Sequence, residues 1–219
     1  KLGLKTIRID LDGQFRCGGS RLYGNWIAGV LNLGENKQFS WEEDPNFAVQ
    51  VVDSPEDMER LLKVKNEQGY KARIAAGYCW TWNDPREDGT LPNDVVIGSW
   101  SKPWNVKSDR AVGGYLSGEL WAIDPKGFDQ IGCVYTVQGF EYDWNGVILG
   151  PDLVWRNDKW IAVPSGSKDP AMRGVDPSNY ERLIKNTYKV LLTRGLVGTY
   201  LYSVDAETQE HLKSLLRAN

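Results

Sequence analysis

Three polar groups in this sequence could together bind a phosphate and assist its transfer. Arg16 lies on a glycine-rich turn, and Arg194 ends an expected helix directly before an expected strand. A polar elbow, Gln138–Glu141, joins two apolar, β-prone runs between them. Phosphoryl transfer needs donors that neutralise charge on the phosphate oxygens, and two guanidiniums beside one site provide them. Gly139 lets backbone N–H groups approach a phosphate, and Glu141 can accept hydrogen bonds from ribose hydroxyls.

The same residues also fit simpler interpretations. Each arginine alone could form a surface salt bridge, and the elbow could be a solvated turn between two strands. The functional interpretation requires Arg16, Arg194 and the elbow to meet in one crevice at a rim of the sheet. In open α/β sheets ligands bind beyond the carboxyl ends of the strands, so we expect the elbow there.

Hydrophobic periodicity places these groups in an alternating pattern of strands and helices. Helix starts are indicated by the capping residues Ser20, Ser54 and Asp205, and by Asp176-Pro177 with a capping box at residues 178–181. Strands are expected at 5–11, 47–52, 71–77, 131–135, 146–149 and 197–203, and a hairpin at 153–156 and 160–163. This order predicts an α/β fold with a mainly parallel sheet and crossover helices.

Residues 78–130 interrupt the pattern with glycine, proline and many aromatic side chains. Only 94–97 and 120–123 have the composition of strands there, so we expect an insertion of short strands and loops packed on the sheet. Five of its rings are candidates for stacking on nucleic-acid bases, each contributing about 1–3 kcal/mol without reading the sequence. These are Tyr78, Trp80, Trp82, Trp100 and Trp104. The alternative is that they pack the insertion onto the sheet, as tryptophan usually does.

Composition limits the possible functions. The 219 residues are 41% hydrophobic and 25% charged, as in ordinary globular proteins, and a net charge of −3 argues against a broadly basic surface. Nucleic acid would therefore meet a local patch. Three cysteines without C-x-x-C spacing and one histidine, His211, make a metal site unexpected and favour a reducing cytoplasm. We expect His211 to be solvated, and no membrane contact, because no apolar run is long enough to span a bilayer.

Several stretches resemble a known family. Gln14-Phe15-Arg16 resembles helicase motif IV of superfamily one, residues 136–141 resemble motif V, and residues 188–195 resemble motif VI. Longer segments resemble the Schlafen-group-3-like DNA/RNA helicase family of bacterial proteins: QFRCGGS, AGYCWTW, DVVIGSW with KPWN, QIGCVYTVQGFEYDWNGVILGPDLVWR and NTYKVLLTRG. The likeness covers nearly the whole chain, and the tryptophan-rich insertion is a trait of this family.

The resemblance implies that residues 1–219 form a RecA-like, three-layer α/β/α domain, the second of two in an ATP-driven nucleic-acid motor. On that basis Arg16 and Arg194 would contact the γ-phosphate of ATP, with Arg194 as the arginine finger. The resemblance also implies that Gln14 positions the arginine turn, that Gln138 and Gly139 sense the phosphate and couple it to a bound strand of DNA or RNA, and that Glu141 holds the ribose.

The sequence departs from a complete motor in one respect. It contains no G-x-x-x-x-G-K-[ST] motif, the loop that cradles phosphates in such ATPases. The resemblance places that loop and the magnesium-binding acids on a preceding P-loop domain, so the chain alone is expected to hydrolyse ATP negligibly. The alternative function is a non-catalytic module that keeps a degenerate RecA-like fold and binds nucleic acid or protein through its aromatic face.

Overall fold

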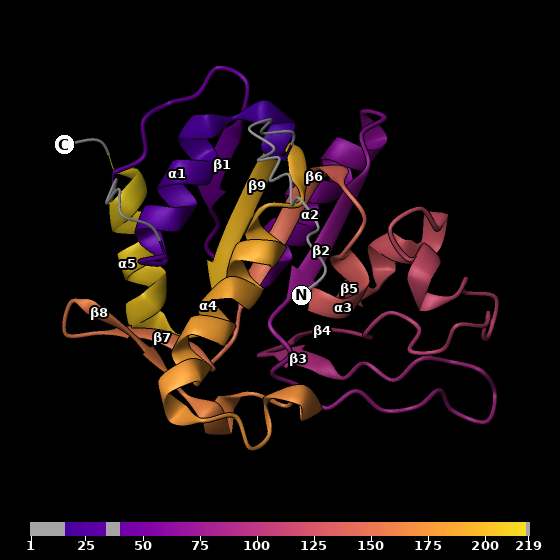
Figure 1. Cartoon of the computed structure of the whole chain (residues 1–219). Coiled ribbons are helices and arrows are strands. Elements are labelled where there is room, and N and C mark those ends of the chain that lie inside the picture. Colours follow the sequence, from indigo (N-terminus) through magenta and orange to yellow (C-terminus); the bar gives the residue numbers. More distant parts are fainter. Residues whose placement is uncertain (1–15, 34–39, 218–219) are drawn as a thin grey trace, which may run out of the picture.

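The computed structural model describes residues 16–33 and 40–217. These residues form a central five-stranded sheet with helices packed against it (Figure 1). All strands of this sheet are parallel, in the order β1-β9-β6-β2-β5. They are β1 Ala48–Val51, β2 Ala72–Ala76, β5 Ile131–Gly132, β6 Tyr142–Leu149 and β9 Gly195–Ser203. The expected α/β class with a parallel sheet is confirmed, and the arrangement is consistent with a RecA-like α/β/α fold.

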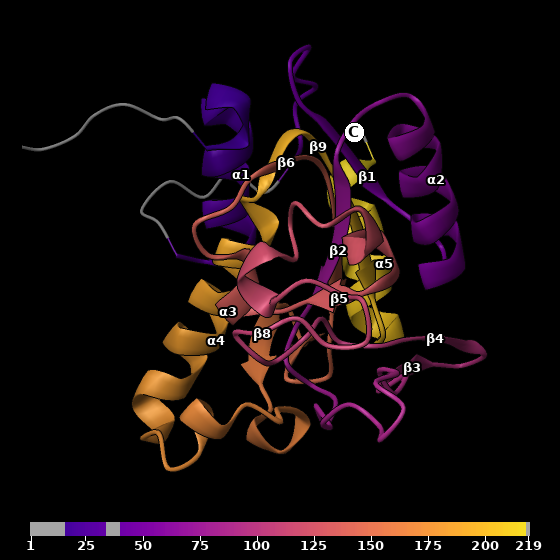
Figure 2. The ribbon, with the colours of Figure 1, turned by 90° about the vertical axis from the view of Figure 1, so that its right-hand side faces the viewer.

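Helices cover both faces of the sheet. Those described are α1 Arg21–Val30, α2 Pro55–Glu67, α3 Val134–Val137, α4 Pro177–Leu192 and α5 Ala206–Leu216. Figure 2 shows α1, α3 and α4 on one side of the sheet and α2 on the other. The side chains of Ser20, Ser54, Asp176 and Asp205 accept hydrogen bonds at the N-termini of α1, α2, α4 and α5, so the expected helix starts are confirmed. No helix in the described part of the chain has the length and apolar character to cross a bilayer.

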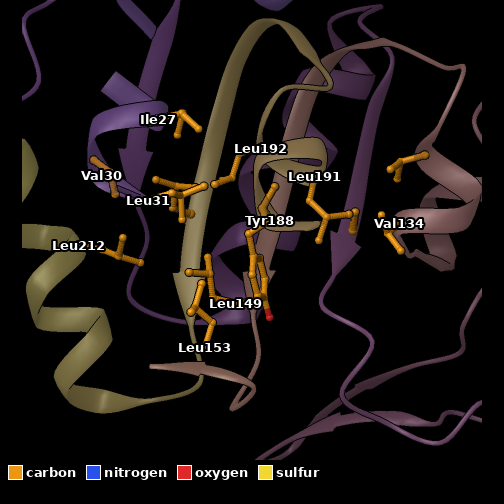
Figure 3. Packing of buried hydrophobic residues seen from close by; sticks show 14 of the residues in the cluster. Ile27, Val30, Leu31, Val134, Leu149, Leu153, Tyr188, Leu191, Leu192 and Leu212 are labelled. Atoms are coloured by element: carbon orange, nitrogen blue, oxygen red, sulfur yellow. The ribbon is translucent and has the colours of Figure 1, made fainter. Parts of the chain in front are cut away.

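The hydrophobic core lies in two clusters, one on each face of the sheet. The first lies between the sheet and helices α1 and α4, where Leu31, Leu149 and Leu192 meet (Figure 3). On the other face, α2 crosses β6 so closely that a Cβ at Gly146 would lie 2.7 Å from Leu62. Strand β6 is thus buried from both sides, as expected for a central parallel strand.

The insertion contains one short antiparallel hairpin, β3 Val95–Ile97 with β4 Trp100–Lys102. Its other regular elements are the 3-10 helices η2 Gly118–Leu120 and η3 Pro125–Asp129. The strand expected at 120–123 is wrong: the chain turns there, and Trp121 is buried with its indole N–H donating to the carbonyl of Gly127 at 2.9 Å. The need to bury this ring outweighs the local strand pattern.

The strand expected at 131–135 ends early, at Gly132. The N–H of Cys133 donates to Thr136 Oγ1 at 3.0 Å and starts α3, so Val134 is helical despite its β propensity. Strand β6, by contrast, begins at Tyr142, four residues before the expected start at 146. The strand expected at 5–11 and the position of Gln14 lie outside the described residues.

The expected hairpin near the C-terminal third is confirmed as β7 Leu153–Arg156 and β8 Lys159–Ala162. Its two turn residues have positive φ angles of 50° and 57°, which suit the twist of a two-residue hairpin. The short helices η4 Pro164–Gly166 and η5 Pro170–Met172 follow it. The expected solvation of His211 is wrong, because its ring stacks on Trp155 with centroids 3.6 Å apart and planes 3° from parallel.

Candidate functional site

Arg16, Glu141 and Arg194 come together where β6 and β9 begin, at the upper end of the sheet in Figure 1. Glu141 directly precedes β6 and Arg194 directly precedes β9, while Arg16 precedes the 3-10 turn η1 (Cys17–Gly19) that contacts β9. The N–H of Tyr142, next to Glu141, donates to the carbonyl of Arg194 at 3.2 Å, and the charges of Arg16 and Glu141 both act on the pKa of Arg194. We call these three residues the arginine cluster. It lies at the amino ends of the strands, whereas we expected a crevice at the carboxyl ends.

The C-terminal end of α4 fixes the position of Arg194. An α-helix leaves its last four carbonyls without partners inside the helix. In α4 side chains satisfy all four: Lys189 O accepts from Thr193 Oγ1 at 2.8 Å, Val190 O from Arg194 Nε at 2.9 Å, Leu191 O from Asn145 Nδ2 at 2.9 Å and Leu192 O from Tyr23 OH at 2.8 Å. The Nε bond orients the plane of the Arg194 guanidinium, and its two terminal Nη groups form no hydrogen bond with a described residue.

The turn that carries Arg16 is shaped by consecutive residues with positive φ. These angles are 56° at Cys17, 60° at Gly18 and 82° at Gly19, in the left-handed region where glycine is favoured. A Cβ at Gly18 would lie 2.3 Å from the carbonyl oxygen of Leu196 in β9. The absence of a side chain at Gly18 therefore lets η1 lie directly on β9 and brings Arg16 beside Arg194.

Burial and like charge both act on Arg194. Its exposed fraction is 5%, and burial followed by the charge of Arg16 lowers its pKa, against the opposing effects of Tyr142 and Glu141. Burial also raises the pKa of the Cys17 thiol to about 12, so Cys17 is neutral. Among the described residues neither arginine forms an ion pair with a carboxylate. Two neighbouring guanidiniums that no described carboxylate pairs with make a site that an anion would stabilise.

The elbow residues other than Glu141 lie near a separate pocket. Gln138 and Phe140 line a pocket of about 610 Å³, which we call the aromatic pocket. Its other walls include Tyr78, just beyond the carboxyl end of β2, and Asp169, just before η5. No member of the arginine cluster lines this pocket. The elbow therefore connects two sites, with Gln138 at one and Glu141 at the other.

The elbow glycine adopts a backbone conformation that favours glycine. Gly139 has a φ of 86°, and a Cβ there would have open space around it. Its left-handed conformation, rather than a close packing contact, thus explains the glycine. The exposed backbone of this residue is accessible to a ligand between the two sites.

The five candidate stacking residues occupy different environments. Trp100 and Trp104 are only 6% and 1% exposed, and their indole N–H groups donate to Glu59 and to the carbonyl of Thr81. These two rings pack within the protein, which argues against the base stacking expected of them. Their burial depends on contacts with α2 and with the segment after β2, which the local sequence does not show.

The other three rings are partly exposed. Tyr78 and Trp82 line the aromatic pocket, with centroids 5.7 Å apart and planes at 71°. Trp80 does not line the pocket, and its indole N–H donates to the carbonyl of Val96 at 3.0 Å. Of the expected stacking residues, Tyr78 and Trp82 are therefore the two placed to contact a ligand in this pocket.

Several residues that support these sites were missed by the sequence analysis. Asn145 and Tyr142 join the start of β6 to α4, because Tyr142 OH donates to Asn145 Oδ1 at 3.0 Å while Asn145 donates to α4. A polar residue inside the apolar run of β6 was the available signal for Asn145. Tyr135 and Asp169 of the aromatic pocket carried no such signal, because a loop far along the chain brings Asp169 to α3.

A comparison with protein families decides the affiliation of this domain. The family model described as "Schlafen group 3, DNA/RNA helicase domain" matches residues 2–205, most of the chain. The chain belongs to this family. The Schlafen group 3 match includes every residue of the arginine cluster and of the aromatic pocket, so both lie within the family domain. The family connects the chain with a nucleic-acid-related role.

One curated relative of this Schlafen group 3 domain is a yeast protein. The chain is 28% identical over 223 residues to "Uncharacterized protein YPL245W" of Saccharomyces cerevisiae. The alignment covers 92% of this chain but 47% of the yeast protein, so the chain spans about half the length of that relative. The similarity therefore reaches a eukaryotic protein.

Proposed function

We propose that this chain is the C-terminal motor domain of an ATP-dependent DNA/RNA helicase-like protein. Arg194 acts as the arginine finger on the γ-phosphate, Arg16 is the second phosphate contact, and Glu141 holds the ribose. Gln138 and Gly139 couple the phosphate to a bound single strand. Family membership supports the connection with nucleic acid, and the arginine cluster supports the role in ATP hydrolysis.

The observation that carries this proposal is the convergence of the arginine cluster. Holding Arg16 near the buried Arg194 is unfavourable by itself, since each positive charge raises the free energy of the other. A triphosphate beside them would remove this repulsion and accept hydrogen bonds from the Nη groups of Arg194. Donors placed in advance in this way stabilise the charge that develops on a transferred phosphoryl group.

The residues present fit the phosphate end of ATP but not a bound magnesium ion. Within residues 16–33 and 40–217 no group of three or more His, Cys, Asp or Glu side chains could hold a metal. The sequence also lacks the phosphate loop. In this proposal a preceding P-loop domain of the same polypeptide supplies that loop and the magnesium ligands, and this chain completes the site from the opposite side.

The proposal predicts two measurable effects of Arg194→Ala. Tripolyphosphate binding to the purified chain, measured by calorimetry at low salt, should weaken by about tenfold or more, the loss expected for hydrogen bonds between charged groups. ATP hydrolysis by the chain combined with its P-loop domain should fall by about 10³-fold or more. Arg182→Ala is the matched control, because Arg182 is an exposed residue of α4, the helix that precedes Arg194, and both activities should be retained.

Two results would contradict this function. One is ATP turnover by the isolated 219-residue chain that is lost in Arg194→Ala, since half a site should not hydrolyse ATP. The other is equal tripolyphosphate affinity in Arg194→Ala and Arg182→Ala. In either case the arginine cluster would not be the phosphate-binding half of a two-domain site.

A non-catalytic binding module is the second candidate. The observation that favours it is the aromatic pocket, because a ligand can bind there without contacting the arginine cluster. This candidate predicts no ATP hydrolysis even when a P-loop domain of the same polypeptide is present, together with ligand binding that does not depend on Arg194. The ATPase measurement above therefore separates the two functions.

A further inference from the structure

The walls of the aromatic pocket are rings held at fixed angles. Tyr78 lies against Trp82 with planes at 71°, and against Tyr135 at 6.5 Å with planes at 84°. Behind them the buried Trp104 contacts both Tyr78 and Trp82, at 5.7 Å and 5.8 Å. Because the rings are supported from behind and are partly exposed in front, they form a preorganised surface for a flat apolar ligand.

Among the described polar groups of the pocket, carboxylates, which only accept hydrogen bonds, outnumber ammonium groups, which only donate. Three carboxylates line it, those of Asp109, Glu119 and Asp169. Asp169 is held in place, because Tyr135 OH donates to its two oxygens at 2.8 and 2.9 Å. Lys107, whose ammonium is the one found among the described lining residues, pairs with Asp84 at 3.8 Å, outside the pocket. The three carboxylates therefore favour a ligand that donates hydrogen bonds.

These two properties select a class of ligand. A phosphate group would face three carboxylates and is excluded from the pocket itself. A nucleobase has a flat ring that stacks on aromatic side chains, and adenine, cytosine and guanine also carry an exocyclic amino group that donates to carboxylates. Uracil and thymine present carbonyl oxygens at the corresponding positions, which carboxylates repel. Gln138, with one amide donor group and one acceptor, fits the remaining edge of a base.

We infer that the aromatic pocket binds one unstacked nucleobase of a single strand and prefers bases with an exocyclic amino group. This inference rests on the nucleic-acid role in the proposed function and adds a base preference to it. The backbone of the strand would remain outside the pocket, beside the exposed Gly139. Rings and carboxylates would also suit a cationic side chain of a protein partner, and the experiment distinguishes that occupant.

The first experiment measures binding of two labelled oligonucleotides, hexacytidylate and hexauridylate, by fluorescence anisotropy at low salt. These two differ at C4 of each base, where cytosine has an amino group and uracil a carbonyl. We expect hexacytidylate to bind about tenfold more tightly, the discrimination that one well-placed base contact gives. Equal affinities would overturn the inference.

Two variants test which ring makes the contact. Trp82→Leu removes a pocket wall, and binding of hexacytidylate should weaken by about tenfold, the effect of losing one stacked base. Trp80→Leu is the matched control: Trp80 also follows β2 and also contacts Trp104, at 6.3 Å, but does not line the pocket. Its affinity should stay near that of the unmodified protein. Equal losses in both variants would show a structural effect and overturn the inference.

A second variant tests the base preference without removing a ring. Glu119→Gln and Asp109→Asn together replace two exposed carboxylates that stabilise no helix of the core, so folding should be unaffected. The preference for hexacytidylate over hexauridylate should fall to less than about threefold, because amide groups can serve both bases. An unchanged preference would contradict the reading of the base by Glu119 and Asp109.

The remaining outcomes identify the alternative occupant and separate this inference from the proposed function. Failure of both oligonucleotides to bind, with Trp82-dependent binding of tetramethylammonium or of a lysine-rich peptide, would show a cation site and overturn the inference. Arg194→Ala should leave hexacytidylate binding intact. If Arg194→Ala changed neither tripolyphosphate binding nor ATP hydrolysis but hexacytidylate were still preferred, only the proposed function would be refuted. If Arg194→Ala had both effects but the two oligonucleotides bound equally, only this inference would be refuted.

Discussion

Asn145 of β6 holds the C-terminal end of α4, so replacing it should disturb the arginine cluster without touching it. Its side chain is fully buried, at 0% exposed. It donates to Leu191 O at 2.9 Å and accepts from Tyr142 OH at 3.0 Å. Asn145→Ala removes both bonds and leaves a buried carbonyl and a buried hydroxyl without partners.

The expected loss follows from these two groups. Each buried polar group left without a partner costs about 1–3 kcal/mol, so Asn145→Ala, which leaves two, should lower the free energy of unfolding by about 2–6 kcal/mol. A domain of this size has a typical stability of about 5–15 kcal/mol, so the variant should still fold. Since α4 ends directly before Arg194, tripolyphosphate binding should weaken as well.

Urea unfolding followed by circular dichroism measures the first effect and calorimetry the second. Asn186→Ala is the matched control, because Asn186 lies on α4 and its amide donates to Arg182 O at a partly exposed position. That variant should lose less than about 1 kcal/mol, as is usual for substitutions away from buried groups. If Asn145→Ala were no more destabilising than Asn186→Ala, the network at the end of α4 would not hold the cluster in place.

Two further predictions concern residues at other positions. Burial against Trp155 lowers the pKa of His211 to about 4, so its resonance, the only histidine signal, should titrate near pH 4 in a proton NMR experiment. Because the unfolded chain binds this proton near pH 6.5, stability should fall as the pH drops from about 6.5 to about 4, and His211→Phe should lose this dependence. A titration near pH 6.5 would contradict the stacked arrangement. Gly18→Ala should destabilise the folded protein more than Gly174→Ala does. Both glycines have positive φ, but only at Gly18 would the added Cβ meet a backbone oxygen, that of Leu196 at 2.3 Å. Equal decreases in melting temperature would refute this packing.

The local elements could be read from the sequence because their signals are local. Ser20 and Ser54 cap helices whose apolar stripes repeat at helical spacing, and both helices form as expected. The hairpin of β7 and β8 has its turn where the pattern changes, at Asn157 and Asp158. Each of these depends on a few neighbouring residues, so one sequence is sufficient to predict it.

The sites depend on distant contacts and were harder to predict. Glu141 lies beside Arg194 because β6 pairs with β9 in the sheet. This pairing cannot be predicted from the order of the strands along the chain. Trp104 is buried because rings from the segment after β2 cover it, although its own neighbours in sequence resemble an exposed loop. The sequence therefore suggested which residue types form the two sites. The order of the strands determined which of these residues lie in the arginine cluster and which lie in the aromatic pocket.

The hydrogen bond from Arg194 Nε to Val190 has a consequence for substitution at this position. One edge of the planar group closes the helix, and the opposite edge with its two amino groups is directed elsewhere. Lysine has a single ammonium on a flexible chain and cannot serve both edges at once. Replacing Arg194 by lysine would keep the positive charge. The lysine, however, would lose either the hydrogen bond to Val190 O at the end of α4 or the contact with an anion.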